Sequence, residues 1–171
     1  MKERIQAFAG SMMIPIILLV VAGIFIGIGA AFANVQNAEA LHLGWLIKEG
    51  NFMHSFFKII NDLGFMVMRF LPVFFAVGLA FGLARQENGW AAFGGLVLFL
   101  GLNTVINAML AINGWTAETT SVEALIAAGY TELDAMNFNS LFGNVLGIFT
   151  YNMSIFSGLI AGLVTSIIHN K

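Results

Sequence analysis

The chain has 171 residues, of which 59% are hydrophobic and only 9% are charged, and its formal net charge is −2. Soluble domains carry about 25% charged residues, so this composition excludes disorder, a coiled coil and a basic nucleic-acid-binding surface. The absence of cysteine excludes disulfides, cysteine-bound zinc and thiol nucleophiles. The remaining class is an integral membrane protein in contact with a lipid bilayer.

Long stretches without charged side chains define the segments that cross the membrane. No Asp, Glu, Lys or Arg occurs in residues 5–38, 88–117 or 135–170. Within 63–84 the only charge is Arg69. A helix needs about 20 mostly apolar residues to cross a hydrocarbon core of about 30 Å, and these runs are too uniformly apolar for barrel strands. We predict an all-α membrane protein with four transmembrane helices, over residues 12–33, 63–84, 91–113 and 145–168.

The distribution of basic residues predicts the orientation, because cytoplasmic segments are enriched in Lys and Arg. With a cytoplasmic N-terminus, the outside segments contain Lys48 and Lys58. The cytoplasmic segments then contain Lys2, Arg4, Arg85 and Lys171. This count predicts an N-in, C-in protein, which agrees with an even number of spans.

Two connections are ambiguous or short. Residues 52–62 have an apolar pattern with helical spacing. The pattern fits an interfacial helix, and it fits equally an extension of the second span that breaks near Gly64. Residues 85–89 are polar and end in glycine, which predicts a tight cytoplasmic turn between two spans.

The outside loop over residues 114–140 contains a helix-start signal. Thr120 and Glu123 fit a capping box, in which each side chain satisfies an unpaired backbone N–H. We therefore predict a short helix that continues to about residue 128 and stops at Gly129.

Glycines four residues apart indicate how the helices pack. Helices in lipid associate through close backbone contact at small residues. Four such pairs lie within the predicted spans: Gly23/Gly27, Gly78/Gly82, Gly143/Gly147 and Gly158/Gly162. We favour packing within the bundle, because this spacing is common in membrane helices. The alternative is a homodimer contact or a contact with another part of the protein.

Few polar side chains lie inside the predicted spans. Arg69 is about one turn inside the second span, where we favour its reaching the interface over a pair with Asp62. Asn103 and Asn107 are four residues apart in the third span. Hydrogen bonds between helices are a commoner use of such amides than a polar path.

The sequence contains no pattern for catalysis or metal binding. His42, His54 and His169 lie at or outside the ends of the predicted spans, without a partner at metal-ligand spacing. No span contains Asp or Glu, which argues against a proton or cation pathway within this chain. No phosphate-binding loop or catalytic triad is present. We therefore expect no catalytic residue, no metal and no cofactor.

The only two prolines, Pro15 and Pro72, lie early in the first and second predicted spans. Each removes one helix hydrogen bond, which a neighbouring group replaces or a kink accommodates. A local kink explains them at least as well as a role in gating.

Three stretches resemble one family of membrane proteins. The first is Phe8-Ala9-Gly10-Ser11-Met12-Met13-Ile14-Pro15, followed by Gly23, Gly27 and Gly29. The second and most specific is Phe70-Leu71-Pro72-Val73-Phe74-Phe75-Ala76-Val77-Gly78, which continues through Gly82 and Arg85 to Gly89. The third runs from Gly147 through Gly158-Leu159-Ile160-Ala161-Gly162 to Lys171. Together they resemble the enzyme IIC permeases of the bacterial phosphoenolpyruvate sugar phosphotransferase system, in the glucose, maltose and N-acetylglucosamine group.

The resemblance covers the whole chain but only the first part of the family's pattern. It implies an N-terminal half for dimerisation and scaffold, and a C-terminal transport half that holds the sugar site. The chain would then be a fragment or part of a split permease in the bacterial inner membrane. The missing transport half and a second copy are its implied partners. Its substrate-binding residues remain unknown, because the family's sugar-site residues fall beyond residue 171.

The resemblance also implies a division of chemistry. Enzymes IIB and IIA phosphorylate the sugar in the complete system, so this chain is expected to be a permease component and not an enzyme. The alternative is a small stand-alone oligomeric membrane protein, either a pore-former or an accessory subunit, which the glycine pairs permit.

Overall fold

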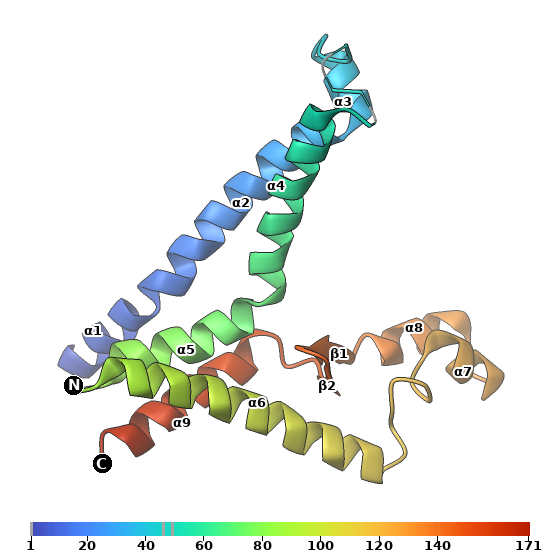
Figure 1. The fold of residues 1–171 in the computed structure, drawn as a ribbon. Helices are drawn as coiled ribbons and strands as arrows, with labels where there is room; N and C mark the ends of the chain where they lie inside the picture. The colour runs from blue at the N-terminus through green and yellow to red at the C-terminus, as the bar shows by residue number, and fades with distance from the viewer. Residues whose placement is uncertain (1, 46, 49) are drawn as a thin grey trace. The chain divides into compact units, whose positions relative to one another are not determined.

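The computed structural model describes residues 2–45, 47–48 and 50–171. In this part of the chain, nine helices and one two-stranded sheet follow one another (Figure 1). The prediction of an all-α protein is therefore confirmed in part, because the chain is mostly helical. The chain divides into two compact units, Met12–Leu71 and a larger unit that combines Met1–Ser11 with Pro72–Lys171.

The smaller unit is a hairpin of two long helices that lie side by side (Figure 1). They are α2 (Met13–Ala33) and α4 (Phe52–Arg69), and the short α3 (Val35–Ala40) follows α2. The Asn34 side chain accepts a hydrogen bond from the Gln36 N–H at 2.9 Å and so begins α3.

Small residues hold the hairpin of α2 and α4 together. A side chain on Gly29 would overlap the backbone of Asn61, and one on Gly64 would overlap Ile26. The Asn61 amide donates a hydrogen bond to the Ile26 carbonyl at 3.2 Å. The His54 ring donates a second hydrogen bond, to the Ala33 carbonyl at 3.1 Å, and the rings of Phe32 and Phe57 stack. Close backbone contact at two glycines therefore acts together with two polar contacts and one aromatic pair.

Residues 52–62 belong to α4, which is continuous through Gly64 as far as Arg69. The break that the sequence suggested near Gly64 lies instead at Phe70, and α5 (Leu71–Leu83) begins directly after it. Pro72 explains this position, because it has no N–H for the Met68 carbonyl and its ring crowds that carbonyl. The kink expected at Pro72 is therefore a full helix break.

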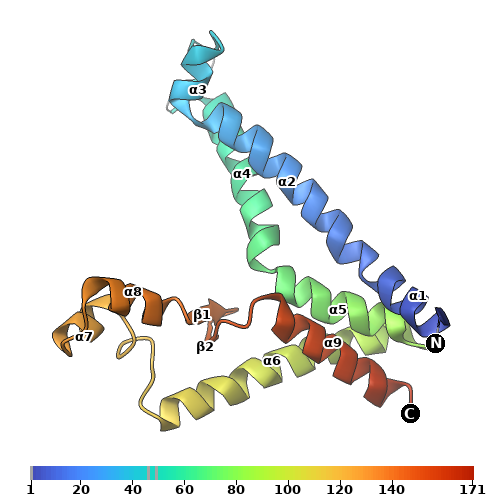
Figure 2. The same cartoon turned by 180° about the vertical axis from the view of Figure 1, so that it is seen from behind.

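The larger unit contains four of the longer helices (Figure 2), which are α1 (Lys2–Ser11), α5, α6 (Asn88–Ile112) and α9 (Ile155–His169). Its core lies where α5, α6 and α9 meet, at Ala76, Phe99 and Ala161, each at most 1% exposed. α1 and α2 are separated by a turn at Met12. In a continuous helix the ring of Pro15 would crowd the carbonyl four residues earlier, at Ser11, and the turn at Met12 directly follows that residue.

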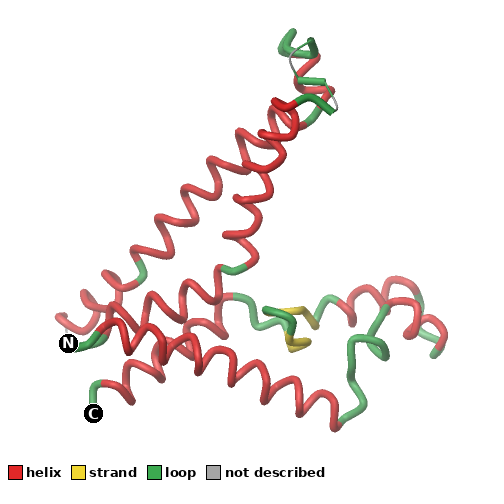
Figure 3. Tube along the Cα trace, in the orientation of Figure 1, coloured by secondary structure: helices red, strands yellow, loops and turns green. Residues whose placement is uncertain are grey.

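Two short helices and a β-hairpin connect α6 to α9 (Figure 3). They are α7 (Val122–Ala127), α8 (Glu132–Asn139), β1 (Phe142–Val145) and β2 (Ile148–Tyr151). The strands are antiparallel, with Phe142 opposite Tyr151 and Val145 opposite Ile148.

The start of α7 differs by one residue from the expected capping box. Ser121, not Thr120, is the N-cap, and its hydroxyl accepts a hydrogen bond from the Ala124 N–H at 3.2 Å. The Thr120 hydroxyl donates instead to the Thr116 carbonyl at 2.7 Å. The expected stop at Gly129 is present, and its φ of +97° explains why glycine stands there.

The fourth predicted span, residues 145–168, requires a correction. Its first part forms the β-hairpin, and helix begins only at Ile155. Asn144 Oδ1 accepts a hydrogen bond from the Gly147 N–H at 2.8 Å, and Gly147 has a φ of +87°. These contacts make a turn between β1 and β2. The pair Gly143/Gly147 is therefore not a helix-packing motif.

Two helices in the described residues are long and apolar enough to cross a membrane, Gln6–Ala33 and Asn88–Ile112. A third span arises if α4 and α5 together count as one broken span. α9 is apolar but has only 15 residues. The structure therefore supports two or three spans by length and composition. Four spans remain a proposal.

The paired asparagines of α6 do not link two helices. Asn103 donates to the Phe99 carbonyl of its own helix at 2.8 Å. Asn107 donates to the Phe149 carbonyl in β2 at 2.6 Å. The second bond does cross between elements, but it fixes the β-hairpin against α6.

We predict that Asn107→Leu lowers the free energy of unfolding by about 1 kcal/mol, because it leaves the Phe149 carbonyl without its donor. Thr104→Val is the matched control, since the Thr104 hydroxyl bonds only to the Leu100 carbonyl of its own helix. Thermal unfolding in detergent, followed by circular dichroism, measures both. Equal effects for the two variants would contradict a special role for the Asn107 bond.

Candidate functional site

The stretch that carries the most specific part of the family resemblance forms α5, and α9 packs directly on its backbone. A Cβ on Gly158 would collide with the Pro72 carbonyl oxygen. A Cβ on Gly162 would lie 2.6 Å from Leu79 Cβ and 2.9 Å from the Ala76 carbonyl oxygen. The two helices therefore touch through main-chain atoms, as the Gly158/Gly162 spacing predicted.

α6 approaches the same part of α5. A Cβ on Gly95 would lie 2.8 Å from the Ala76 carbonyl oxygen and 2.7 Å from Ala80 Cβ. The Ala76 carbonyl thus has a glycine from each neighbouring helix beside it, Gly95 from α6 and Gly162 from α9. Ala76, Leu79 and Ala80 are fully buried. This contact explains why small residues recur along α5.

The Phe8-to-Pro15 stretch meets α5 at its other end. A Cβ on Gly82 would collide with Ser11, which closes α1. Ser11 is 4% exposed, and its hydroxyl donates to the Phe8 carbonyl at 2.7 Å. The partner of Gly82 is therefore α1, so Gly82 of the predicted pair Gly78/Gly82 contributes to packing within the larger unit. Gly78 is also buried in α5.

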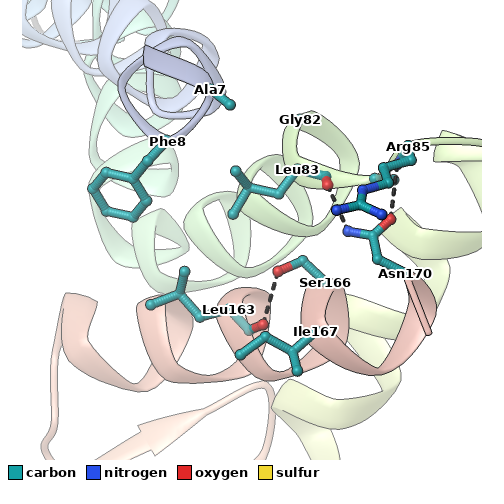
Figure 4. Close-up of a pocket in the computed structure, with 10 residues that line it drawn as sticks. Ala7, Phe8, Gly82, Leu83, Arg85, Leu163, Ser166, Ile167 and Asn170 are labelled. Atoms are coloured by element: carbon teal, nitrogen blue, oxygen red, sulfur yellow. Dashed lines mark hydrogen bonds between the residues drawn. The ribbon is translucent and has the colours of Figure 1, made fainter. Parts of the chain in front are cut away.

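The turn between α5 and α6 is held by His169 and Asn170, which follow the apolar part of α9, and Figure 4 shows the two bonds of Asn170. Asn170 Oδ1 accepts from the Arg85 backbone N–H at 2.8 Å, and Asn170 Nδ2 donates to the Leu83 carbonyl at 2.8 Å. His169 Nε2 donates to the Gln86 carbonyl at 2.8 Å. We call this set of three bonds the turn clamp. It satisfies the Leu83 carbonyl at the C-terminal end of α5, which has no partner within the helix, and the Gln86 carbonyl of the turn.

The structure does not bring all of the predicted motif residues together. Gly29 belongs to the contact between α2 and α4, whereas Gly23 and Gly27 lie exposed on α2 with open space around them. Gly89 is exposed in the first turn of α6. Pro15 is buried in α2. The remaining motif residues Phe70 and Leu71 form the break between α4 and α5.

The polar candidates make no chemical centre. Asp62 and Arg69 line one shallow pocket, but they form no ion pair with each other. Within the described ranges, no group of three or more His, Asp or Glu side chains lies together in a form that would hold a metal ion.

We predict that Gly158→Ala destabilises the fold by about 1–3 kcal/mol, the usual effect of overpacking, because the added methyl would meet a main-chain carbonyl. Gly101→Ala is the matched control, since nothing lies within 4 Å of that position on α6. Unfolding of both variants in the same detergent tests this. A Gly158→Ala variant as stable as the Gly101→Ala variant would contradict the backbone contact.

The packing and the turn clamp use all three stretches that resemble enzyme IIC, and comparison with known proteins agrees. A family model described as "Phosphotransferase system, EIIC" matches residues 9–171. The chain belongs to this family. As a member of this family with long apolar helices, it is a membrane-protein component of the phosphotransferase system.

Several curated relatives match the EIIC chain along its full length. A "PTS system alpha-glucoside-specific EIICB component" of Klebsiella pneumoniae is 34% identical over 174 residues, covering 100% of this chain and 29% of the relative. A protein with the same description from Leptotrichia buccalis is 26% identical, again covering 100% and 29%. The "Phosphotransferase IIC component GlvC" of Escherichia coli is 30% identical, covering 100% and 42%. The chain therefore spans less than half the length of these relatives.

Sequence reasoning missed the turn clamp. His169 and Asn170 directly follow an apolar run, and this pattern indicates the end of a helix. It does not indicate their hydrogen-bond partners, which lie 83 to 87 positions earlier in the chain. It also missed the close contacts of Gly94 and Gly95. The packing prediction relied on glycines four residues apart, and these two are adjacent.

Proposed function

We propose that the chain supplies the scaffold and dimer contacts of a sugar permease, and that the sugar site lies in a transport half outside it. The family match over residues 9–171 is the observation that carries this proposal. The packing of α5, α6 and α9 through backbone contacts suits a part that stays rigid while another part moves. The helices α2, α5, α6 and α9 contain no carboxylate that would coordinate a cargo.

The proposed cargo is an α-glucoside such as maltose. Four relatives of this chain are described as specific for alpha-glucosides or maltose. The names of these relatives also include a B component, which supports a IIB protein or domain, charged by IIA, as the partner that phosphorylates the sugar. The alternative of a stand-alone pore-former or accessory subunit is not favoured, because the family match spans nearly all of the chain.

We also propose four crossings of the bacterial inner membrane with both termini in the cytoplasm. In the larger unit, Phe8 of α1, Arg85 of the turn and Asn170 all line one pocket, so both terminal segments reach the same end of α5. Most of the basic residues belong to these segments. α9 rises only about 22 Å, so the crossing at α9 also needs the residues before Ile155 to cover a core of about 30 Å.

A chimera tests the scaffold role. We predict that the Klebsiella pneumoniae relative, with its matched 174-residue segment replaced by this chain, still takes up α-glucosides and keeps its own order of sugar preference. Uptake of labelled sugars by cells that express the chimera measures this. The matched control carries Gly158→Leu in the inserted segment, which should abolish assembly and uptake. A changed sugar preference would contradict the proposal, because it would mean that this chain contains sugar-selecting residues.

The dimer contact is proposed for the exposed face of α2, where Gly23 and Gly27 have open space. We predict that Gly23→Leu combined with Gly27→Leu converts a dimer to a monomer, because bulky side chains separate helices that need backbone contact. Light scattering after size exclusion in detergent measures the mass. Gly101→Leu, at an equally open glycine on α6, is the control. A dimer that survives the double substitution would show that α2 is not the contact.

A further inference from the structure

A pocket of about 650 Å³ lies beside the turn clamp, between α1, α5 and α9 (Figure 4). Its two sides differ in chemistry. Phe8, Leu163 and Ile167 line the apolar side, whereas Arg85 and Asn170 lie together at the other side (Figure 4). A pocket with this division fits a ligand that has an apolar part and a polar part.

The position of the pocket along the helices identifies the environment of that ligand. The apolar residues of α5 give way to Arg85, and those of α9 give way to Asn170 and Lys171. This change from apolar to charged residues marks the boundary between hydrocarbon and water in a membrane protein. Ile167 is 60% exposed, so the apolar side of the pocket is reachable from the lipid.

The polar side favours an anion. No described anionic side chain forms an ion pair with the Arg85 guanidinium, and only the Arg85 backbone N–H takes part in the turn clamp. Asn170 Nδ2 uses one N–H for the Leu83 carbonyl and keeps a second one available. A guanidinium with a neighbouring amide N–H matches the oxygens of a phosphodiester.

The helix termini next to the pocket also affect its preference for an anion. α5 and α9 end here, and the partial negative charge of a helix C-terminus disfavours an anion. The turn clamp neutralises part of that charge, because the Asn170 amide donates to the Leu83 carbonyl at the end of α5. The N-terminus of α6, which begins at Asn88 after the turn, adds a partial positive charge. Arg85 carries the one full charge among the residues that line the pocket, and Glu87 of the same turn is not among them, so Arg85 decides the sign.

We propose that this pocket binds one anionic glycerophospholipid, with its phosphodiester at Arg85 and Asn170 and an acyl chain against Phe8 and Leu163. This inference rests on the lining and position of the pocket, and it does not depend on the identity of the sugar. A bound lipid would fill the space between α1 and α9 and so stabilise the end of the larger unit at which the turn clamp lies.

Native mass spectrometry of the purified 171-residue chain in a charge-neutral detergent tests the proposal. The chain is titrated with phosphatidylglycerol and with phosphatidylcholine of identical acyl chains. We expect one phosphatidylglycerol to bind more tightly than phosphatidylcholine. Arg85→Gln should weaken phosphatidylglycerol binding by about tenfold and leave phosphatidylcholine binding unchanged. Ile167→Trp, which narrows the apolar side, should weaken the binding of both lipids.

Lys58→Gln is the matched control, since it removes one exposed positive charge from α4 without touching the pocket. Circular dichroism of each variant checks that helix content is retained. Equal binding of the two lipids, or an equal loss in Lys58→Gln and Arg85→Gln, would overturn the proposal. Displacement of the lipid by free glycerol phosphate would also overturn it, because the site would then recognise phosphate alone.

Discussion

The contact between the glycines of α9 and the backbone of α5 is the constraint on which the larger unit depends. Gly158 meets the Pro72 carbonyl and Gly162 meets the Ala76 carbonyl, so the two main chains are in direct contact. Water does not drive helices together inside a bilayer, and dispersion between closely fitted backbones replaces that force. Once α9 is seated in this way, its end is placed against the turn after Leu83, where Asn170 and His169 complete the hydrogen bonding. The turn clamp is thus a consequence of packing several turns away.

The two prolines have a related effect on the division of the chain. The smaller unit begins at Met12 and ends at Leu71. Pro15 follows the first of these positions by three residues, and Pro72 follows the second directly. Each proline disrupts the helical bonds of the residues before it, and both helix breaks coincide with a unit boundary. A local loss of hydrogen bonds therefore divides a largely helical chain into two separately packed units.

Some of this architecture follows from sequence, and the failures have identifiable causes. The charge-free runs located α2 and α6 well, because a long apolar run has few alternatives to a helix. The same reasoning failed for residues 145–151, since a short apolar run can be a strand or a helix. The signals that distinguish them were Asn144 and Gly147, which form the hairpin turn.

The glycine pairs illustrate a different limit. Spacing identifies a helix face with small residues, but it does not identify the partner of that face. Gly158 and Gly162 pack as expected, whereas Gly23 and Gly27 have no neighbour in the structure. Gly95, which has no partner at the expected spacing within its helix, lies as close to the Ala76 carbonyl as Gly162 does. Only three-dimensional placement distinguishes these cases.

The fate of the polar side chains inside the helices links packing to function. A sugar presents many hydroxyl groups, and a site for it needs donors and acceptors that the protein has not already used. In the described helices, Asn103 and Ser166 bond to their own helices, and Asn107 bonds to β2. The hydroxyls of Thr150 and Thr165 are buried without a described partner, but they belong to separate elements, β2 and α9. Asn103, Asn107 and Ser166 thus have their partners within the chain, which agrees with the proposed role of a scaffold.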